Sequence, residues 1–421
     1  MKLKRRFRVI LAMVAALVLL GGVAVAKDRA YRVIHNFQGS SDGWKPLGVP
    51  AAAKNDDLYG TTNYGGTSGW GTVFKLTAPK TRGGAWKKTI LYNFPGGSGG
   101  GGPESLVLGA DGNLYGNSTQ TIFELLRPTS RNAVWTYAAL YTLNQNSDGA
   151  NILGNLVLDA GGNLYGAAGL GGDPSCNNGY GCGTVFELQR PTKDGGQWVL
   201  SVLYTFTGRP DGEEPWAGIT LDQKGNFYGT TNYGGTYGYG TVYRVSPPAQ
   251  KSGPWTETVL YSFDPATNMG ASAEGPVTFD GSGNMYGTTA FGGDLNCQGG
   301  YGCGVVFELT EAGGTWTYAN LYSFPGGNDG LNPGGYIVID PKGRLYSTTQ
   351  LGGGSNAGIA FRLSPPVQKG DPWTETVLHT FKGTDDEGDN GGLIWGKWGD
   401  LYGVTYAGGV YGAGTVFELQ P

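Results

Sequence analysis

The sequence predicts an all-β fold, a seven-bladed β-propeller of four-stranded antiparallel blades whose last blade is closed by the N-terminal strand. Three observations predict it: a tripeptide returns seven times, each copy contains four strand-like segments, and the two chain ends hold complementary parts of one copy. We expect one domain over 27–421, with copies at about 38–94, 95–143, 144–206, 207–263, 264–324, 325–381 and 382–421 plus 31–37.

The repeated tripeptide is Leu-Tyr-Gly or a close variant of it. Its copies begin 50 to 63 residues apart, a spacing that leaves room for four short strands and their loops. The seven copies are Leu58–Gly60, Leu114–Gly116, Leu164–Gly166, Phe227–Gly229, Met285–Gly287, Leu345–Ser347 and Leu401–Gly403.

The fourth copy shows the four strands of one blade, here called A, B, C and D. Each is short, rich in β-branched or aromatic residues, and bounded by Gly, Pro, Asn or Asp. The predicted strands are Ala217–Asp222, Asn226–Thr231, Gly240–Val245 and Trp255–Phe263. In the D strand, a period of two places Trp255, Val259, Tyr261 and Phe263 on one face.

The two ends of the chain predict how the ring closes. The last copy stops after its C strand, Gly414–Leu419, and a lone D-like strand, Tyr31–Phe37, precedes the first copy. We therefore expect 31–37 to pair with 414–419, which would remove an unpaired sheet edge. An open solenoid is the alternative, and it leaves both fragments unexplained.

Two residue types recur at fixed places in the D strands. A tryptophan lies five residues before the D-strand leucine in six copies, where we expect it to pack between blades. The only two histidines, His35 and His379, replace a recurring D-strand tyrosine, a position that favours packing over general-base catalysis. The six tryptophans are Trp86, Trp135, Trp198, Trp255, Trp316 and Trp373.

Composition excludes several other classes of protein. Glycine accounts for 79 of 421 residues without a Gly-X-Y period, which argues against both long helices and collagen. The 16 Phe, 25 Tyr and 11 Trp are spread along the chain, which argues against disorder.

The N-terminus predicts export. Residues 1–8 hold five cationic side chains, Val9–Ala26 is uncharged and mostly apolar, and Ala24–Ala26 forms an A-x-A cleavage signature. We interpret 1–26 as a signal peptide, with an uncleaved anchor as the alternative. Its removal leaves 24 Lys and Arg against 33 acidic residues, a balance that disfavours nucleic acid as a partner, and no second apolar stretch could span a membrane.

The four cysteines form two matched pairs, Cys176 with Cys182 and Cys297 with Cys303, in the same Gly-Gly-Asp…Cys-x5-Cys-Gly context. In an exported protein this pattern predicts two local disulfides. A zinc site is the alternative, although it would need four converging ligands.

The pattern Leu-Tyr-Gly-Thr-Thr-x-Tyr-Gly-Gly…Gly-Thr-Val-Phe-x-Leu, as in 58–76, 227–245 and 401–419, resembles the GloVer (Gloeo/Verruco) repeat. That repeat characterises bacterial extracellular tandem-repeat proteins of the choice-of-anchor type. The resemblance covers nearly the whole mature chain and implies export and a repeat fold but no particular activity. Copy two departs from it, because Asn117–Thr121 replaces the Gly-Gly loop, and this sequence ends at Pro421 without a C-terminal anchor. The strand order with Gly-Gly and Trp is also similar to kelch repeats, which are propellers.

Propeller geometry places the D–A and B–C loops on one face, where ligands usually bind in this architecture. The B–C loops combine glycine with aromatic rings, which can stack on sugar rings and donate hydrogen bonds. The alternative is that the rings cover the barrel while the glycines supply turns. The candidate binding residues are Tyr64, Trp70, Tyr180, Tyr233, Tyr237, Tyr239, Tyr301, Tyr406 and Tyr411.

Charged loop residues divide between the two faces. The D–A loops are acidic, and calcium is conceivable there, although no loop matches a full calcium motif and solvated turns are the favoured interpretation. These acids are Asp42, Asp148, Asp211, Glu213, Glu214, Glu274, Asp329, Asp385, Asp386, Glu387 and Asp389. The C–D loops are basic, with Lys80, Arg82, Arg131, Lys193, Lys251 and Lys369. The A–B hairpins carry Asp-x-x-Gly-Asn, as in Asp159–Asn163, Asp222–Asn226 and Asp280–Asn284, which we interpret as Asx-type turns.

No catalytic residue is predicted, because no nucleophile elbow, P-loop or dinucleotide motif stands in a suitable context. We expect a non-catalytic propeller without a cofactor that binds a glycan or an extracellular protein through its aromatic loops. A metal-dependent propeller hydrolase of the lactonase or esterase kind, with a site at the channel mouth, is the alternative. A spacer role without a small ligand also remains open.

Overall fold

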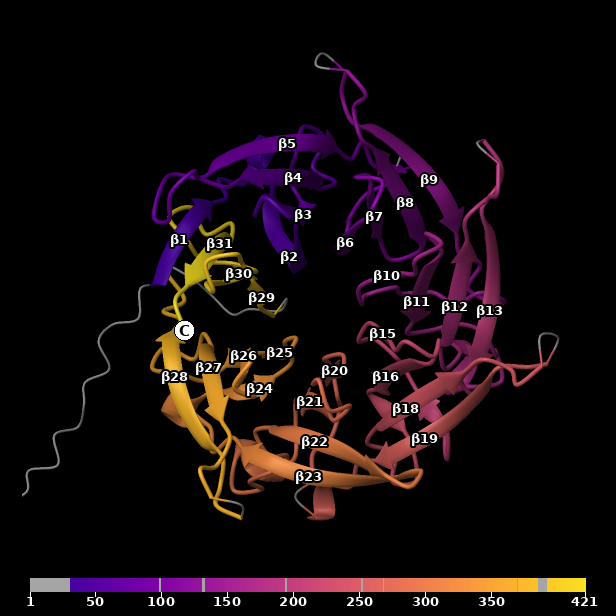
Figure 1. Cartoon of the computed structure of the whole chain (residues 1–421), viewed down its shortest axis with the longest axis vertical. Helices are drawn as coiled ribbons and strands as arrows, with labels where there is room; N and C mark the ends of the chain where they lie inside the picture. The colour runs from indigo at the N-terminus through magenta and orange to yellow at the C-terminus, as the bar shows by residue number, and fades with distance from the viewer. Residues whose placement is uncertain are drawn as a thin grey trace, which may run out of the picture.

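The computed structural model describes residues 31–421 apart from 98–99, 131–132, 194, 251–252, 268, 369 and 385–391. These residues form a closed ring of β-sheets around a central axis (Figure 1). The predicted signal segment, 1–26, lies outside the described residues. No helix within them is long and apolar enough to cross a membrane.

Seven sheets follow one another around the ring, each with four strands that run from an inner A strand to an outer D strand. The sixth sheet has a fifth strand, β24 (Leu331–Pro333), which comes from the D–A loop and pairs with the B strand of that blade. The first blade comprises β2 (Trp44–Ala52), β3 (Leu58–Tyr64), β4 (Thr72–Thr77) and β5 (Lys87–Asn93), and the second comprises β6 (Ser105–Leu108), β7 (Leu114–Asn117), β8 (Thr121–Leu126) and β9 (Thr136–Thr142). The third blade comprises β10 (Val157–Leu158), β11 (Leu164–Ala168), β12 (Thr184–Gln189) and β13 (Val199–Thr205). The fourth comprises β15 (Thr220–Leu221), β16 (Phe227–Thr231), β18 (Thr241–Ser246) and β19 (Thr256–Ser262).

The remaining blades repeat the same order. The fifth blade comprises β20 (Thr278–Phe279), β21 (Met285–Thr289), β22 (Val305–Ala312) and β23 (Thr315–Ser323). The sixth comprises β25 (Val338–Ile339), β26 (Leu345–Leu351), β27 (Ile359–Ser364) and β28 (Thr374–Thr380). The seventh comprises β29 (Ile394–Trp395), β30 (Leu401–Thr405), β31 (Thr415–Leu419) and β1 (Tyr31–Asn36). Short 3₁₀ turns occupy Ser40–Asp42, Asn177–Gly179, Pro265–Thr267, Gln298–Gly300 and Gly327–Asp329.

The predicted B, C and D strands of the fourth copy agree with β16, β18 and β19 to within a residue or two, but the A strand does not. The prediction for Ala217–Asp222 was too long, because β15 covers only Thr220–Leu221. Glycine and proline at the start of the inner strands explain the difference, since they bring the chain around a narrow axis without regular pairing. Gly218 is an example, because a Cβ there would lie 2.9 Å from the backbone nitrogen of Asn155 in the neighbouring blade.

The D strands each contain an irregularity that the period of two did not anticipate. In β19, Tyr261 lies opposite Val242 whereas Val259 lies opposite the adjacent Tyr243, so a bulge at Leu260 shifts the register. The prediction that Trp255, Val259, Tyr261 and Phe263 share one face was therefore wrong, because a bulge reverses the alternation of side chains. Trp255 packs toward the third blade and Tyr261 toward the fifth.

The predicted ring closure is confirmed. Strand β1 pairs antiparallel with β31, from Tyr31 opposite Leu419 to Asn36 opposite Thr415. The Arg32 guanidinium donates from Nε to the Glu418 carboxylate at 2.9 Å, and the Phe37 backbone N–H donates to the Gly414 carbonyl at 3.0 Å. The leading strand thus supplies the outer strand that the last repeat lacks.

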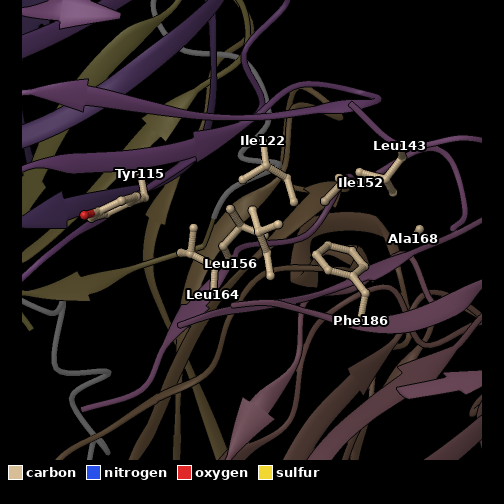
Figure 2. Packing of buried hydrophobic residues seen from close by; sticks show 9 residues of the cluster. Tyr115, Ile122, Leu143, Ile152, Leu156, Leu164, Ala168 and Phe186 are labelled. Carbon is tan, nitrogen blue, oxygen red and sulfur yellow. The ribbon is translucent and has the colours of Figure 1, made fainter. Parts of the chain in front are cut away.

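The hydrophobic core lies between the blades rather than at one centre. Each of seven buried clusters draws side chains from two neighbouring blades; the cluster in Figure 2 joins the second and third blades through Ile122, Leu156, Leu164 and Phe186. Another cluster joins the seventh blade to the first, with Phe37 beside Phe74. Seven interfaces for seven blades are what a closed ring requires.

The tryptophans pack between blades, as predicted. Five of them meet the tyrosine of the Leu-Tyr-Gly motif in the preceding blade with ring centroids 5.5 to 6.5 Å apart: Trp86 with Tyr402, Trp135 with Tyr59, Trp198 with Tyr115, Trp316 with Tyr228 and Trp373 with Tyr286. Trp255 contacts Phe227 of its own blade and packs in the core shared with the third blade. The repeated motif is therefore explained by blade packing.

Candidate functional site

The D–A and B–C loops lie together on one face of the ring. In the fourth blade, β14 (Gly212–Glu213) from the D–A loop pairs with β17 (Tyr233–Gly234) from the B–C loop. Bridges between Ala150 and Leu170 and between Ala271 and Phe291 join the same two loops elsewhere. This shared surface is called the loop face below.

The paired glycines of the B–C loops are required by backbone geometry. Gly171 and Gly172 both have φ near +80°, a conformation that residues with a Cβ rarely adopt. A Cβ at Gly171 would lie 2.2 Å from the carbonyl oxygen of Gln145 in the D–A loop. The glycines therefore let the two loops pack together, which agrees with their predicted turn role.

Most of the predicted binding rings are exposed on the loop face. Eight of the nine are more than two-fifths exposed, from 44% for Tyr64 to 73% for Tyr301, and Tyr406 is half-buried. The exposed members are Tyr64, Trp70, Tyr180, Tyr233, Tyr237, Tyr239, Tyr301 and Tyr411. These rings are therefore accessible from solvent, as a binding role would require.

Two predicted rings are brought together where the seventh blade meets the first. The Lys45 ammonium lies 5.5 Å from the ring centroid of Tyr64 and 4.5 Å from that of Tyr406. Trp44 joins them, since its ring is 5.7 Å from that of Tyr64 and is 43% exposed. Sequence reasoning missed Trp44 and Lys45, which begin β2 rather than lying in a B–C loop.

Trp70 is supported by the glycine run of the next D–A loop. A Cβ at Gly96 would lie 2.3 Å from the indole ring, and one at Gly101 would lie 3.0 Å from the Trp70 Cβ. Glycine is therefore needed beneath this ring. The ring retains an exposed surface on the loop face.

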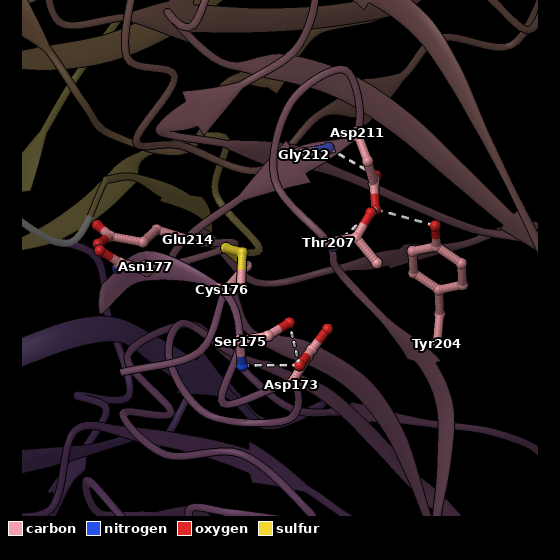
Figure 3. The surroundings of a disulfide bond; sticks show 10 residues. Asp173, Ser175, Cys176, Asn177, Tyr204, Thr207, Asp211, Gly212 and Glu214 are labelled. Atoms are coloured by element: carbon pink, nitrogen blue, oxygen red, sulfur yellow. Dashed lines mark hydrogen bonds between the residues drawn. A yellow bond between two sulfur atoms is a disulfide. The ribbon is translucent and has the colours of Figure 1, made fainter. Parts of the chain in front are cut away.

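Both predicted disulfides are present and hold two of the B–C loops. Cys176 is bonded to Cys182, and Cys297 to Cys303. The first disulfide lies against the D–A loop of the fourth blade, where the Asn177 side-chain amide donates to Glu214 at 3.1 Å (Figure 3). Tyr180, next to this disulfide, has its backbone carbonyl bonded to the Gly171 N–H at 2.7 Å while its ring is exposed.

Three of the D–A aspartates accept a hydrogen bond from a D-strand tyrosine, a role that the prediction of solvated turns did not include. The Tyr204 hydroxyl donates to Asp211 at 2.9 Å, and the Thr207 backbone N–H donates to the same carboxylate oxygen (Figure 3). The same pairing, with the aspartate seven residues after the D-strand tyrosine, joins Tyr141 to Asp148 and Tyr322 to Asp329. Asp385, Asp386, Glu387 and Asp389 lie outside the described residues.

The two histidines have packing roles, as predicted. His35 takes the place of the tyrosine in this pairing and lies 3.2 Å from Asp42, and His379 stacks on Tyr31 with ring centroids 3.6 Å apart. Burial lowers the pKa of His35, which holds the ring neutral. Neither histidine is placed near the axis of the ring.

The opposite face carries the A–B and C–D loops. The Asp-x-x-Gly-Asn hairpins form the predicted Asx-type turns, in which the Asn163 backbone N–H donates to Asp159 at 2.8 Å and the Asn226 N–H to Asp222 at 2.9 Å. Of the basic residues, Lys80 and Lys193 are exposed, while Arg82 donates from Nε to the buried Asp400 at 2.9 Å. Arg131, Lys251 and Lys369 lie outside the described residues.

A cavity of about 250 Å³ lies on the axis, where the D–A loops meet the inner strands. We call it the axial cavity. Trp216 and Tyr336 provide aromatic walls, and Glu104 and Glu274 contribute carboxyl groups. Tyr336 reaches from the sixth blade toward the fourth, because its hydroxyl would lie 3.2 Å from a Cβ placed on Gly218.

The two cavity carboxyl groups have raised pKa values because they are buried. Burial raises the pKa of Glu104 to about 7, against a weaker opposing effect of its hydrogen bond from the Asn63 side-chain amide at 3.2 Å. Burial likewise raises the pKa of Glu274, which accepts from Gln350 at 3.2 Å. Sequence reasoning named Glu274 but missed Glu104, which follows a glycine-rich run, and Tyr336, which no local motif marks.

Within the described parts of 31–421, no three His, Cys, Asp or Glu side chains are grouped so that they could hold a metal ion. Glu104 and Glu274 line one cavity as two carboxyl groups, with amides as their partners.

Solved structures similar to this chain share its fold at low sequence identity. An extracellular domain assigned to a hybrid two-component system of B. thetaiotaomicron has a TM-score of 0.53 and 12% identity; the match covers 93% of this chain and 41% of that one. A puromycin hydrolase variant has a TM-score of 0.53 and 13% identity, with 87% and 51% covered. These identities establish similarity of fold alone.

Sequence comparison is more specific. No curated protein matches the chain. The family model described as the Gloeobacter/Verrucomicrobia repeat matches residues 23–193, 121–300 and 295–421, which together span nearly all of the sequence. The resemblance of the repeated motif to this family is thereby confirmed, and the chain belongs to the Gloeobacter/Verrucomicrobia repeat family.

Proposed function

We propose that this propeller is exported and binds a glycan on the loop face through the exposed rings of its B–C loops. The observation that carries the proposal is the set of eight exposed aromatic side chains on one face of a rigid ring. A contiguous exposed patch of apolar side chains marks an interaction site, and on this face the rings of Trp44, Tyr64 and Tyr406 gather around Lys45. Flat rings with free hydroxyl groups suit sugars, which present both apolar faces and hydroxyl groups.

The loops that carry these rings are held in place before any ligand arrives. Paired glycines, disulfides and the bonded backbone of Tyr180 fix them. A preorganised loop loses less conformational entropy on binding than a flexible one, so each ring contact contributes more to affinity. The B–C loops therefore fit a binding role better than a spacer role.

Two features support export. The sequence begins with a cationic and then apolar segment typical of signal peptides. The two disulfides, which persist in oxidising compartments, also indicate a location outside the reducing cytosol. A glycan of a cell surface or of the extracellular matrix is the class of partner that such a protein would meet.

The test is a glycan array probed with the mature protein and with a Tyr64→Ala, Trp70→Ala, Tyr233→Ala, Tyr239→Ala variant. We expect loss of at least tenfold in affinity for any glycan bound, about 1.4 kcal/mol or more. The matched control is Trp398→Ala, an aromatic residue on the A–B turn of the opposite face, which should bind like wild type.

Three results would contradict the proposal: binding that survives the fourfold substitution, binding that the control reduces equally, or no glycan bound by a folded protein. The variants should first be shown to unfold at the wild-type temperature. Surface substitutions usually change stability by no more than about 0.5 kcal/mol, so the folded state is expected to be retained.

A further inference from the structure

The axial cavity is distinct from the exposed rings and has a different chemistry. The exposed rings are uncharged, whereas the cavity is lined by two carboxyl groups, those of Glu104 and Glu274, and has aromatic walls. Glu104 comes from the second blade and Glu274 from the fifth, so the ring closure brings together residues 170 positions apart. Any ligand here would be small, because the space is about 250 Å³.

The two carboxyl groups lack a positively charged neighbour within the described part of the chain. Glu104 accepts one hydrogen bond, from Asn63, and Glu274 accepts one, from Gln350. Three other shielded carboxylates are each paired with a cation: Asp57 with Lys75, Asp400 with Arg82 and Glu418 with Arg32. A buried carboxylate without a cation is costly, so a cationic ligand would relieve that cost.

The walls of the cavity add a second attraction for a cation. Trp216 is the best type of side chain for a cation–π contact, and Tyr336 also presents an aromatic ring. Removal of water from such a site strengthens both the ion pair and the cation–π contact. Carboxyl groups beside aromatic rings are therefore suited to an organic ammonium group, which offers hydrogen-bond donors and positive charge together.

We propose that the axial cavity binds the ammonium groups of a small organic diamine, with Glu104 and Glu274 as counter-ions and Trp216 as its aromatic wall. This site would operate whether or not the exposed rings bind a glycan. Its affinity should rise with pH, because the carboxyl groups must lose their protons to pair with the cation. Glu104, Glu274 and Tyr336 are the titratable groups that face the cavity, and burial keeps the Tyr336 hydroxyl protonated.

The test is isothermal titration of the full mature chain with 1,4-diaminobutane, using 1,4-butanediol as the neutral probe of matched length. At pH 8 we expect one diamine bound per chain and no binding of the diol. At pH 5.5 the affinity should fall at least tenfold, with protons released on binding in the range around pH 7. These wild-type measurements require no variant, so they remain decisive even if a substitution disturbs folding.

Variants then locate the site. Glu104→Gln and Glu274→Gln should each weaken diamine binding at least tenfold, because an amide keeps the shape and removes the charge. Glu213→Gln is the matched control, since Glu213 lies in a D–A loop outside the cavity lining, and it should bind normally. Equal binding of the diol, affinity that does not depend on pH, or wild-type affinity in both cavity variants would overturn the proposal. Calcium bound in place of the diamine, with the same sensitivity to both substitutions, would overturn it in favour of a metal site.

Discussion

Two interfaces between blades place opposite charges at the same repeat position. The position two residues after the D-strand tryptophan is Lys88 in the first blade and Glu257 in the fourth. Both side chains face the preceding blade, close to an aspartate of a D–A loop, Asp42 in one case and Asp211 in the other. The comparison shows how one repeat tolerates either sign of charge at a buried site.

At the closure of the ring, a cation meets the aspartate. The Lys88 ammonium lies 2.8 Å from Asp42 Oδ1 and 4.3 Å from the ring centroid of Phe37. Burial lowers the pKa of Lys88 to about 8, although Asp42 opposes this effect. Lys88 therefore depends on Asp42 to remain charged in the folded protein.

Between the third and fourth blades, a second carboxyl group meets the aspartate. Burial and the charge of Asp211 raise the pKa of Glu257 to about 8, so Glu257 holds a proton at neutral pH. Between the fifth and sixth blades, Glu375 repeats this arrangement beside Asp329, and its pKa is also raised to about 8, but Arg362 opposes the shift. Protonation therefore takes the place of a cation beside Glu257, and beside Glu375 it adds to the effect of Arg362.

The largest expected effect is at the closure. Lys88→Ala should lower the free energy of unfolding by about 3 kcal/mol, because it leaves Asp42 without its cation at a shielded interface. Thermal or urea unfolding at pH 7 measures this, with Lys87→Ala, an exposed neighbour in β5, as the control that should stay within about 0.5 kcal/mol of wild type. Equal stability of the two variants would show that the Lys88–Asp42 pair contributes nothing.

Glu257→Gln should act in the opposite direction and depend on pH. The folded-state pKa of Glu257 is raised, so its contribution to stability is present at low pH and is lost as pH rises toward and beyond about 8. Glutamine cannot ionise, so the variant should be more stable than wild type by about 1 kcal/mol at pH 9, after allowance for solvent screening, with little difference at pH 5. A difference that does not change between pH 5 and 9 would contradict the assignment.

Glu375→Gln should show the same trend with the smallest amplitude. Arg362 already opposes the pKa shift of Glu375, so removal of the charge gains less than at Glu257. We expect a gain well under about 1 kcal/mol at pH 9, measured in the same unfolding series. A larger gain than that of Glu257→Gln would mean that Arg362 does not compensate the carboxylate.

Repetition made the fold predictable from the sequence, because seven copies of one motif and two partial copies at the ends specify both the blade number and the closure. The D-strand bulge was not predictable from the alternation of apolar and polar residues. Leu260 is apolar, so it would fit the strand whether or not a bulge shifted the pairing at this point. The hydrogen bonds between D-strand tyrosines and loop aspartates could have been predicted from the sequence. An aspartate follows the tyrosine by seven residues three times: Asp148 after Tyr141, Asp211 after Tyr204 and Asp329 after Tyr322.

Of the two candidate sites, one could be predicted from the sequence and the other could not. The exposed rings were predictable, because glycine-rich loops between strands lie at the surface and carry their aromatic residues outward. The axial cavity was not, because Glu104, Trp216, Glu274 and Tyr336 come from four different blades and share no motif. Only the curvature of the closed ring brings them together.

The account depends on the leading strand completing the seventh blade, and a double-mutant cycle on Arg32 and Glu418 tests this most directly. The two side chains are 386 residues apart and meet only if β1 pairs with β31. Arg32→Met and Glu418→Gln, alone and combined, should give a coupling free energy of about 1–2 kcal/mol in urea unfolding. Additive effects of the two substitutions would contradict the closure on which both proposed binding sites rest.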